Sequence, residues 1–165
     1  MQNENKLNDN KKIKVVFVCH GNICRSPMAE FVMKELVRRA GLEKEFSITS
    51  AAVTAEEQGN PIYPQSARKL QEKGIPFGNH RAHRITPQEY EDNDLVIVMD
   101  ASNRRLLSRI AGEHSDGKVH LLMEYAGSSA DVADPWYTGD FETAYRDIFA
   151  GCSALLGILS GKTEV

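Results

Sequence analysis

Residues 13–30 read IKVVFVCHGNICRSPMAE and place a strand, a loop and a helix in immediate succession. The segment 13–18 is almost entirely apolar and rich in β-branched residues, which is typical of a strand covered on both faces. Pro27 suits the first position of a helix, and apolar residues then recur every four positions until Gly41. The sequence therefore predicts a strand–loop–helix unit.

The same alternation continues along the chain. Further strands are predicted over residues 46–51, 95–99 and 119–123, and further helices over 65–73, 103–110 and from about Asp140 onward. Thr86 begins a predicted capping box at another helix start. Four strands that alternate with helices predict an α/β fold with one open, four-stranded parallel sheet flanked by helices. Such sheets bind ligands beyond the carboxyl ends of their strands, so the chemistry is expected in those loops.

The composition is that of an ordinary globular protein and narrows the possible partners. Of 165 residues, 41% are hydrophobic and 26% are charged, and the net charge of -3 offers no basic field for nucleic acid. Residues 1–12 are polar, so we expect a disordered tail followed by a single domain over 13–165. No apolar run is long enough to cross a membrane and no signal region is visible. With three cysteines, an odd number, we expect free thiols and a cytoplasmic location.

The loop after the first strand, residues 19–26, has the composition of an anion site. A loop between a buried strand and a helix points backbone N–H groups at one centre, where the helix dipole also favours negative charge. Gly21 and Asn22 are the residues best able to adopt the left-handed conformations that such a loop needs. Cys19 at its edge is expected to be a thiolate, and Arg25 offers a planar fork for two phosphate oxygens.

Six segments of the chain resemble the low-molecular-weight protein tyrosine phosphatases. They read VCHGNICRSPMAE (18–30), SAAV (50–53), GNP (59–61), HRAHRIT (80–86), MDASN (99–103) and DPWYTGDFE (134–142). The resemblance implies a flavodoxin-like fold and hydrolysis of phosphotyrosine through a phosphocysteine intermediate. It also implies a phosphotyrosine-containing protein as substrate, and neither a metal nor an organic cofactor.

The resemblance also assigns roles to individual residues. Cys19 is the expected nucleophile, Arg25 the clamp for phosphate and the transition state, and Asp134 the general acid and base. The remaining phosphate-binding positions are expected to be His20, Gly21, Asn22, Ile23, Cys24 and Ser26, of which Ser26 would donate a hydrogen bond to the thiolate. Ser50 and His80 are expected to hold Asn22 in its strained conformation.

The residues around Asp134 independently support its role. The oxygen of a phosphate ester leaves badly unless a carboxylic acid protonates it, and the resulting carboxylate can then activate water. Of the three aspartates before the last helix, Asp140 is needed as the N-cap and Asp131 has no ordering neighbour. Asp134 shortly precedes Trp136 and Tyr137, which can order the loop, exclude water and flank a phenyl ring.

Four positions bear on specificity within the resemblance. Glu56 stands where an aromatic residue often forms one wall of the substrate cleft, and a carboxylate there should disfavour acidic phosphopeptides. His20 occupies a position that is usually uncharged, and Trp136 stands where tyrosine is usual. Ile23 resembles the tyrosine-specific members, whereas relatives acting on phosphoarginine carry a small hydroxyl residue there, so phosphotyrosine is favoured.

The sequence leaves three alternative functions. A phosphoarginine phosphatase of the same fold is the closest alternative. A thiol-linked arsenate reductase would need two further cysteines, and residues 77–100 contain none. A non-catalytic phosphate-binding module would be expected to lack Cys19, Arg25 or Asp134.

The remaining cysteines and histidines have simpler interpretations. Cys24 is either a packing thiol or the partner that captures oxidised Cys19 in a disulfide, which would make the enzyme redox-sensitive. Cys152 lies on the apolar stripe of the last helix and is expected in the core. His80 and His83 are spaced like a metal pair but lack a third ligand of suitable spacing, so no metal site is expected.

Overall fold

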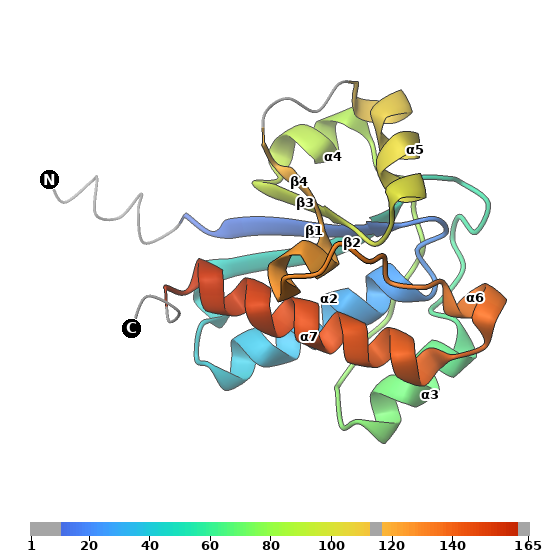
Figure 1. The fold of residues 1–165 in the computed structure, drawn as a ribbon. Coiled ribbons are helices and arrows are strands. Elements are labelled where there is room, and N and C mark those ends of the chain that lie inside the picture. The colour runs from blue at the N-terminus through green and yellow to red at the C-terminus, as the bar shows by residue number, and fades with distance from the viewer. Residues whose placement is uncertain (1–10, 113–116, 162–165) are drawn as a thin grey trace, which may run out of the picture.

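The computed structural model describes residues 11–112 and 117–161, so most of the predicted N-terminal tail lies outside the described residues. Four parallel strands form one open sheet in the order β2-β1-β3-β4 (Figure 1). Their bounds are β1 Ile13–Cys19, β2 Phe46–Ala52, β3 Leu95–Val98 and β4 Val119–Leu121. The predicted α/β fold with a four-stranded parallel sheet is confirmed.

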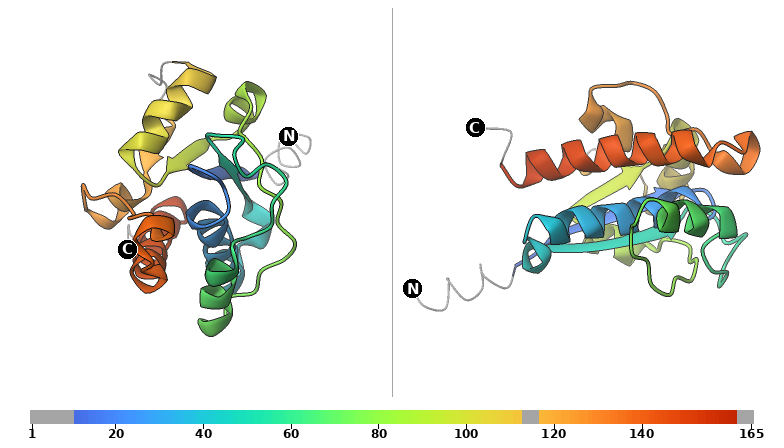
Figure 2. Two further views of the ribbon diagram at one scale, coloured as in Figure 1. Left: turned by 90° about the vertical axis from the view of Figure 1, so that its right-hand side faces the viewer. Right: turned by 90° about the horizontal axis from the view of Figure 1, so that it is seen from below.

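Helices cover both faces of this sheet, as the two views of Figure 2 show. The α-helices are α2 Arg25–Arg39, α3 Pro64–Glu72, α4 Pro87–Asp92, α5 Ala101–Ala111, α6 Pro135–Thr138 and α7 Phe141–Leu159, and the 3-10 helices are η1 Glu43–Glu45 and η2 Leu122–Ala126. Helices α4 and α5 lie on one side, and α2, α3 and α7 lie on the other (Figure 1). No helix in the described part of the chain is both long and apolar enough to span a bilayer.

The central strand β1 supplies both hydrophobic cores. Val15 and Phe17 belong to the core beneath α2 and α7, whereas Val16 and Val18 belong to the core beneath α4 and α5. All four side chains are fully buried. Side chains alternate between the faces of a strand, so a continuous apolar run is the pattern that a doubly covered strand requires. This packing fixes the position of the loop that follows Cys19.

Several local features differ from the sequence-based expectation, including the start of α5 at Ala101 rather than Asn103. Helix α2 begins at Arg25 rather than Pro27, because proline is tolerated throughout a first turn whose N–H groups have no intrahelical partner. Strand β4 ends at Leu121 and is followed by η2, so residues 122–123 were wrongly assigned to the strand. The short helix α6 was not predicted, because one turn is too short to show a helical period.

The N-termini of helices that have side-chain caps agree better with the sequence-based expectation. Asp140 caps α7 by accepting a hydrogen bond from the Thr143 N–H at 2.9 Å, as predicted. Thr86 likewise accepts from the Glu89 N–H at 3.0 Å. The carboxylate of Glu89, expected to return a bond in a capping box, instead pairs with His83 Nε2 at 2.9 Å.

Candidate active site

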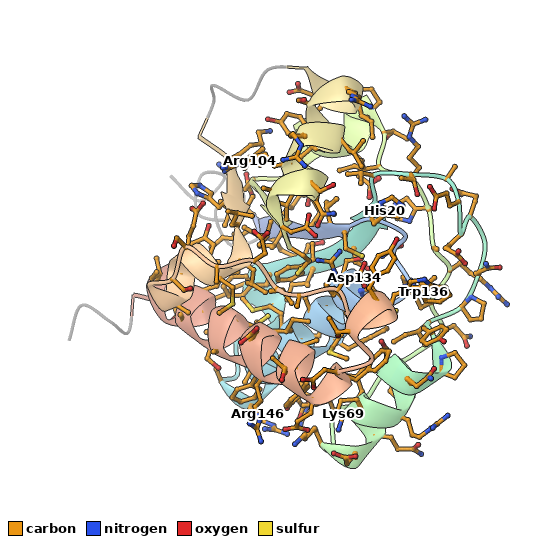
Figure 3. All side chains as sticks on the ribbon, turned by 45° about the vertical axis from the view of Figure 1, so that its right-hand side comes forward. His20, Lys69, Arg104, Asp134, Trp136 and Arg146 are labelled. Carbon is orange, nitrogen blue, oxygen red and sulfur yellow. The ribbon has the colours of Figure 1, made fainter. Side chains whose placement is uncertain are left out.

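A pocket of about 140 Å³ lies at the carboxyl end of the sheet, where the loop after β1 meets segments from elsewhere in the chain. The loop 19–25 forms its floor, Glu56 and Glu57 stand after β2, and residues 134–137 close the remaining side. His20, Asp134 and Trp136 gather in this region, far from Arg146 (Figure 3). Residues more than a hundred positions apart are therefore brought to one site.

The sulfur of Cys19 lies at the buried end of this pocket and faces Ser26. Its Sγ is 3.0 Å from Ser26 Oγ, and the Ser26 backbone N–H donates to it at 3.4 Å. The amide of Asn22 donates to the same Ser26 hydroxyl at 2.8 Å. Because the Asn22 amide donates to a lone pair of the Ser26 oxygen, Ser26 can still donate its own hydroxyl proton. That proton is available for the Cys19 sulfur or for the Ala51 carbonyl, which lies 3.3 Å from Ser26 Oγ.

Asn22 is the one non-glycine residue with positive φ in the described chain, at 61°. Such a left-handed conformation costs roughly 1–2 kcal/mol in a residue with a Cβ atom. Its Nδ2 donates to Ser26 and also to Ser50 at 3.1 Å, and its Oδ1 accepts from the His83 N–H at 3.2 Å. Its carbonyl is 2.6 Å from His80 Nε2. Both Ser50 and His80 thus contact Asn22, and the surrounding bonds offset its strain.

A buried carboxylate behind the loop extends this network. Ser50 Oγ donates to Glu30 Oε1 at 2.6 Å, and the other oxygen of Glu30 pairs with Lys34 at the same distance. Glu30 is only 9% exposed. We did not identify it from the sequence, because a glutamate on an apolar helix face gives no sign of which hydroxyl it will meet.

The guanidinium of Arg25 is buried at 2% exposure and is held by three acceptor groups. Its Nη1 donates to Asp100 Oδ2 at 2.7 Å and to the Val132 carbonyl at 2.8 Å, while Nη2 lies 3.4 Å from Asp134 Oδ2. Burial by itself would lower the pKa of Arg25, but Cys19, Asp134 and Asp100 together raise it above its ordinary value. Arg25 therefore remains charged although it is buried.

Asp100 was missed as a site residue, although it lies in one of the segments that carry the family resemblance. Its Oδ1 accepts from the Asn103 N–H at 2.7 Å and so caps α5, while its Oδ2 binds Arg25. An aspartate before a helix is already explained by capping. Nothing in the sequence indicated its second bond.

Asp134 faces the same centre from the opposite side of the pocket. Its Oδ1 accepts from the Trp136 N–H at 3.0 Å and caps α6, which turns Oδ2 toward Arg25. The indole of Trp136 contacts Tyr63 edge to face, with ring centroids 5.0 Å apart. Trp136 is 52% exposed and Tyr137 is 82% exposed, so both rings stand at the mouth. Tyr63 was not identified from the sequence.

Comparison with known proteins shows to which family this architecture belongs. The family model described as low molecular weight phosphotyrosine protein phosphatase matches residues 14–164. The chain belongs to this family. The family resemblance deduced from the six segments is confirmed, and so is the prediction of an enzyme of this phosphatase class.

Individual relatives agree with that assignment. The low molecular weight protein-tyrosine-phosphatase YfkJ of Bacillus subtilis is 37% identical over 155 residues, which cover 93% of this chain and 99% of YfkJ. Its crystal structure covers 92% of this chain and 97% of its own, with a TM-score of 0.88 and 38% identity. The crystal structure of the Drosophila arginine phosphatase DARP is 31% identical to this chain, and the match covers 88% of this chain and 97% of DARP with a TM-score of 0.80.

The other sequence candidates have defined places in this phosphatase. Ile23 and Cys24 pack with Ala82 in a small cluster beside the loop. The Nε2 atoms of His80 and His83 bond to the Asn22 carbonyl and to Glu89 rather than to each other. Within residues 11–112 and 117–161, no group of three or more His, Cys, Asp or Glu side chains is arranged to hold a metal ion.

Proposed function

We propose that the protein hydrolyses phosphotyrosine in protein substrates, with Cys19 as nucleophile, Arg25 as phosphate clamp and Asp134 as general acid and base. The observation that carries this proposal is the convergence of these three side chains on one pocket, with Ser26 Oγ 3.0 Å from the sulfur. The names of the relatives support phosphotyrosine as the substrate. No step requires a metal or an organic cofactor.

In the first chemical step the Cys19 thiolate attacks the phosphorus of the substrate. A P–S bond forms as the P–O bond to the tyrosine oxygen breaks, and the carboxyl proton of Asp134 passes to that oxygen. The products are free tyrosine hydroxyl and phosphocysteine. Ser26 stabilises the sulfur while it is an anion, through its hydroxyl and its N–H at 3.4 Å.

In the second step water replaces the sulfur. The Asp134 carboxylate takes a proton from water as the water oxygen attacks phosphorus, and the P–S bond breaks. Inorganic phosphate leaves and the Cys19 thiolate is restored. One carboxyl group therefore serves both steps and returns to its starting protonation state.

The geometry of Arg25 suits it to the phosphoryl oxygens in both steps. Nη1 is engaged by Asp100 and Val132, and one N–H of Nη2 is engaged by Asp134 Oδ2 at 3.4 Å, which leaves the Nε N–H and the second Nη2 N–H for substrate oxygens along one edge of the guanidinium. That edge can donate two parallel hydrogen bonds to equatorial oxygens. The N–H groups of the loop, including those of Gly21, Ile23 and Cys24, complete the set of donors for the developing charge.

The substrate cleft has room for an aromatic leaving group. Trp136, braced against Tyr63, offers one wall for a phenyl ring, and Tyr137 extends the mouth. A cytoplasmic location belongs to the same proposal, because Cys19, Cys24 and Cys152 are all free, as a reducing compartment keeps them. The net charge of -3 supports the absence of a nucleic-acid or anionic-membrane partner.

The likeness to the Drosophila arginine phosphatase makes phosphoarginine the second candidate substrate. Ile23 argues against phosphoarginine as the substrate. The side chain is 9% exposed and presents an apolar group to the pocket, where the phosphoarginine-specific relatives were expected to carry a hydroxyl residue.

Turnover of matched peptides tests the proposal. Two peptides of one sequence, carrying phosphotyrosine or phosphoarginine, are compared by kcat/KM, with phosphate release measured in the presence of EDTA. We expect preference for phosphotyrosine, inhibition by vanadate and no loss with EDTA. Preference for phosphoarginine would establish the second candidate, and loss of all activity in EDTA would contradict the mechanism.

A further inference from the structure

Two adjacent carboxylates, Glu56 and Glu57, line the mouth of the pocket in the segment after β2. The Glu56 side chain is 65% exposed, as expected of a group at a rim rather than in the interior. Glu57 is half-buried. An uncharged or aromatic wall would suffice to flank a phenyl ring, so the two charges need a separate explanation.

Both carboxylates are held in place by the loop or by their own segment. Glu56 Oε1 is 3.1 Å from His20 Nε2. Glu57 Oε1 accepts from Asn60 Nδ2 at 2.8 Å, and its chain packs on Gly21 so closely that a Cβ atom there would lie 3.1 Å from Glu57 Cγ. These contacts therefore position both negative charges at the mouth of the pocket.

The cations around the pocket do not cancel these charges. Arg25 lies at the buried end and is already matched by Asp100 and Asp134. His20 offsets Glu56 only when it is protonated. Arg81 bonds to the Gly59 carbonyl at 3.4 Å, in the same segment, but is not among the residues that line the pocket.

The phosphate and the peptide of a bound substrate contact different depths of the pocket. The phosphoryl group must reach Cys19 and Arg25 at the buried end, so the phenyl ring spans the cleft and the peptide backbone crosses the mouth. Side chains next to the phosphotyrosine then meet Glu56 and Glu57. They also meet the exposed rings of Trp136 and Tyr137, which attract cations over their faces.

We infer that this enzyme selects phosphotyrosine flanked by arginine or lysine, with Glu56 and Glu57 as the residues that determine the selection. The inference rests on the proposed function and specifies its substrate class. Basic neighbours would pair with the two carboxylates, whereas acidic neighbours would be repelled by them. Each exposed contact is individually weak, so we expect about a tenfold difference in kcat/KM between basic and acidic peptides.

Three phosphotyrosine peptides of equal length, with arginine, glutamine or glutamate on both sides of the phosphotyrosine, provide the test. For wild type we expect kcat/KM to fall in that order. The spread, meaning the ratio of kcat/KM between the arginine and glutamate peptides, should shrink in about 1 M salt, where charge–charge interactions are screened beyond about 3 Å. Glu56→Gln and Glu57→Gln should each narrow the spread, and the double variant should narrow it to less than about threefold. Glu56→Lys should favour the acidic peptide.

Glu45→Gln is the matched control, because it removes one exposed carboxylate beside the amino end of β2, at the other end of the sheet. It should keep the wild-type order and spread. Equal turnover of all three peptides by wild type would overturn the inference and leave the proposed function standing. Failure to hydrolyse even the glutamine peptide would instead contradict the proposed function. A spread that survives in the double variant, with its fold verified by circular dichroism, would assign the selection to other residues.

Discussion

The loop after β1 and the contact between α7 and η2 are both buried, yet they are stabilised in opposite ways. In the loop, Asn22 and Ser26 are fully buried and each makes several hydrogen bonds. At the other contact, Leu122 packs directly on Gly151, which has no side chain. The first arrangement joins buried polar groups through hydrogen bonds, and the second only removes apolar surface from water.

The same contrast between polar and apolar surroundings distinguishes two cysteines, Cys19 and Cys152. Cys19 lies beside Ser26 and shares a pocket with Arg25. Cys152 is fully buried on α7 in the core, where burial raises its pKa far above the ordinary value and its thiol donates to the Ala29 carbonyl at 3.8 Å. A buried thiol therefore becomes a candidate nucleophile through its neighbours and not through its burial.

The largest expected effect separates these two thiols. Cys19→Ser should reduce turnover by about 10⁴-fold or more, because the nucleophile of a covalent mechanism is lost. Cys152→Ser should leave kcat of the folded enzyme within about twofold, since the added hydroxyl lies in the core and affects stability rather than the pocket. Initial rates with p-nitrophenyl phosphate check both. Comparable loss in the two variants would show that the comparison between the thiols is wrong.

The next effect concerns the proton carried by Asp134. Asp134→Asn should lower kcat on phosphotyrosine by about 10²–10⁴-fold, the usual contribution of a general acid. The amide oxygen can still accept from the Trp136 N–H and cap α6, so the loop should keep its shape. The loss should be smaller on an aryl phosphate with a better leaving group. Equal losses on both substrates would mean that Asp134 orders the loop and transfers no proton.

A third prediction addresses the apolar contact. In Gly151→Ala the new Cβ atom would lie 2.6 Å from Leu122 Cγ, so helix or side chain must shift. We expect a loss of roughly 1–3 kcal/mol in the free energy of unfolding, as for other overpacked cores, with little change in kcat of the folded enzyme. Gly78→Ala, where the added atom meets nothing within 4 Å, is the control. Urea unfolding measures the difference, and a selective loss of kcat would couple this contact to the loop.

The smallest effect appears only after oxidation. Peroxide should convert the Cys19 thiolate to sulfenic acid, and attack by Cys24 sulfur should then release water and form a Cys19–Cys24 disulfide. Burial raises the pKa of Cys24 to about 12, so Cys24 enters the reaction as a thiol that must lose its proton. Dithiothreitol should restore activity in wild type and much less in Cys24→Ser, each relative to its own rate before oxidation. Full recovery of Cys24→Ser, without a Cys19–Cys24 crosslink in peptide maps, would leave Cys24 a packing residue.

The sequence-based reasoning was most successful where neighbours in space are neighbours in sequence. Cys19, Asn22 and Arg25 lie within one loop, so their convergence follows from a strand leading into a helix. Asp134, which lines the pocket, was singled out from two other aspartates because of its aromatic neighbours. Asp100 was missed for the opposite reason, since its visible role as an N-cap concealed a bond to a residue 75 positions away.

The sequence by itself determined the alternation of strands and helices and the family, and it predicts an anion site in the loop after β1. These depend on local periodicity and on short motifs, which are written in consecutive residues. Only the tertiary structure determined which groups hold the Arg25 guanidinium, how Glu30 reaches the loop through Ser50, and that Glu57 joins Glu56 at the mouth. Those contacts join distant segments, and their geometry arises from how α2 and the segment after β2 pack around β1.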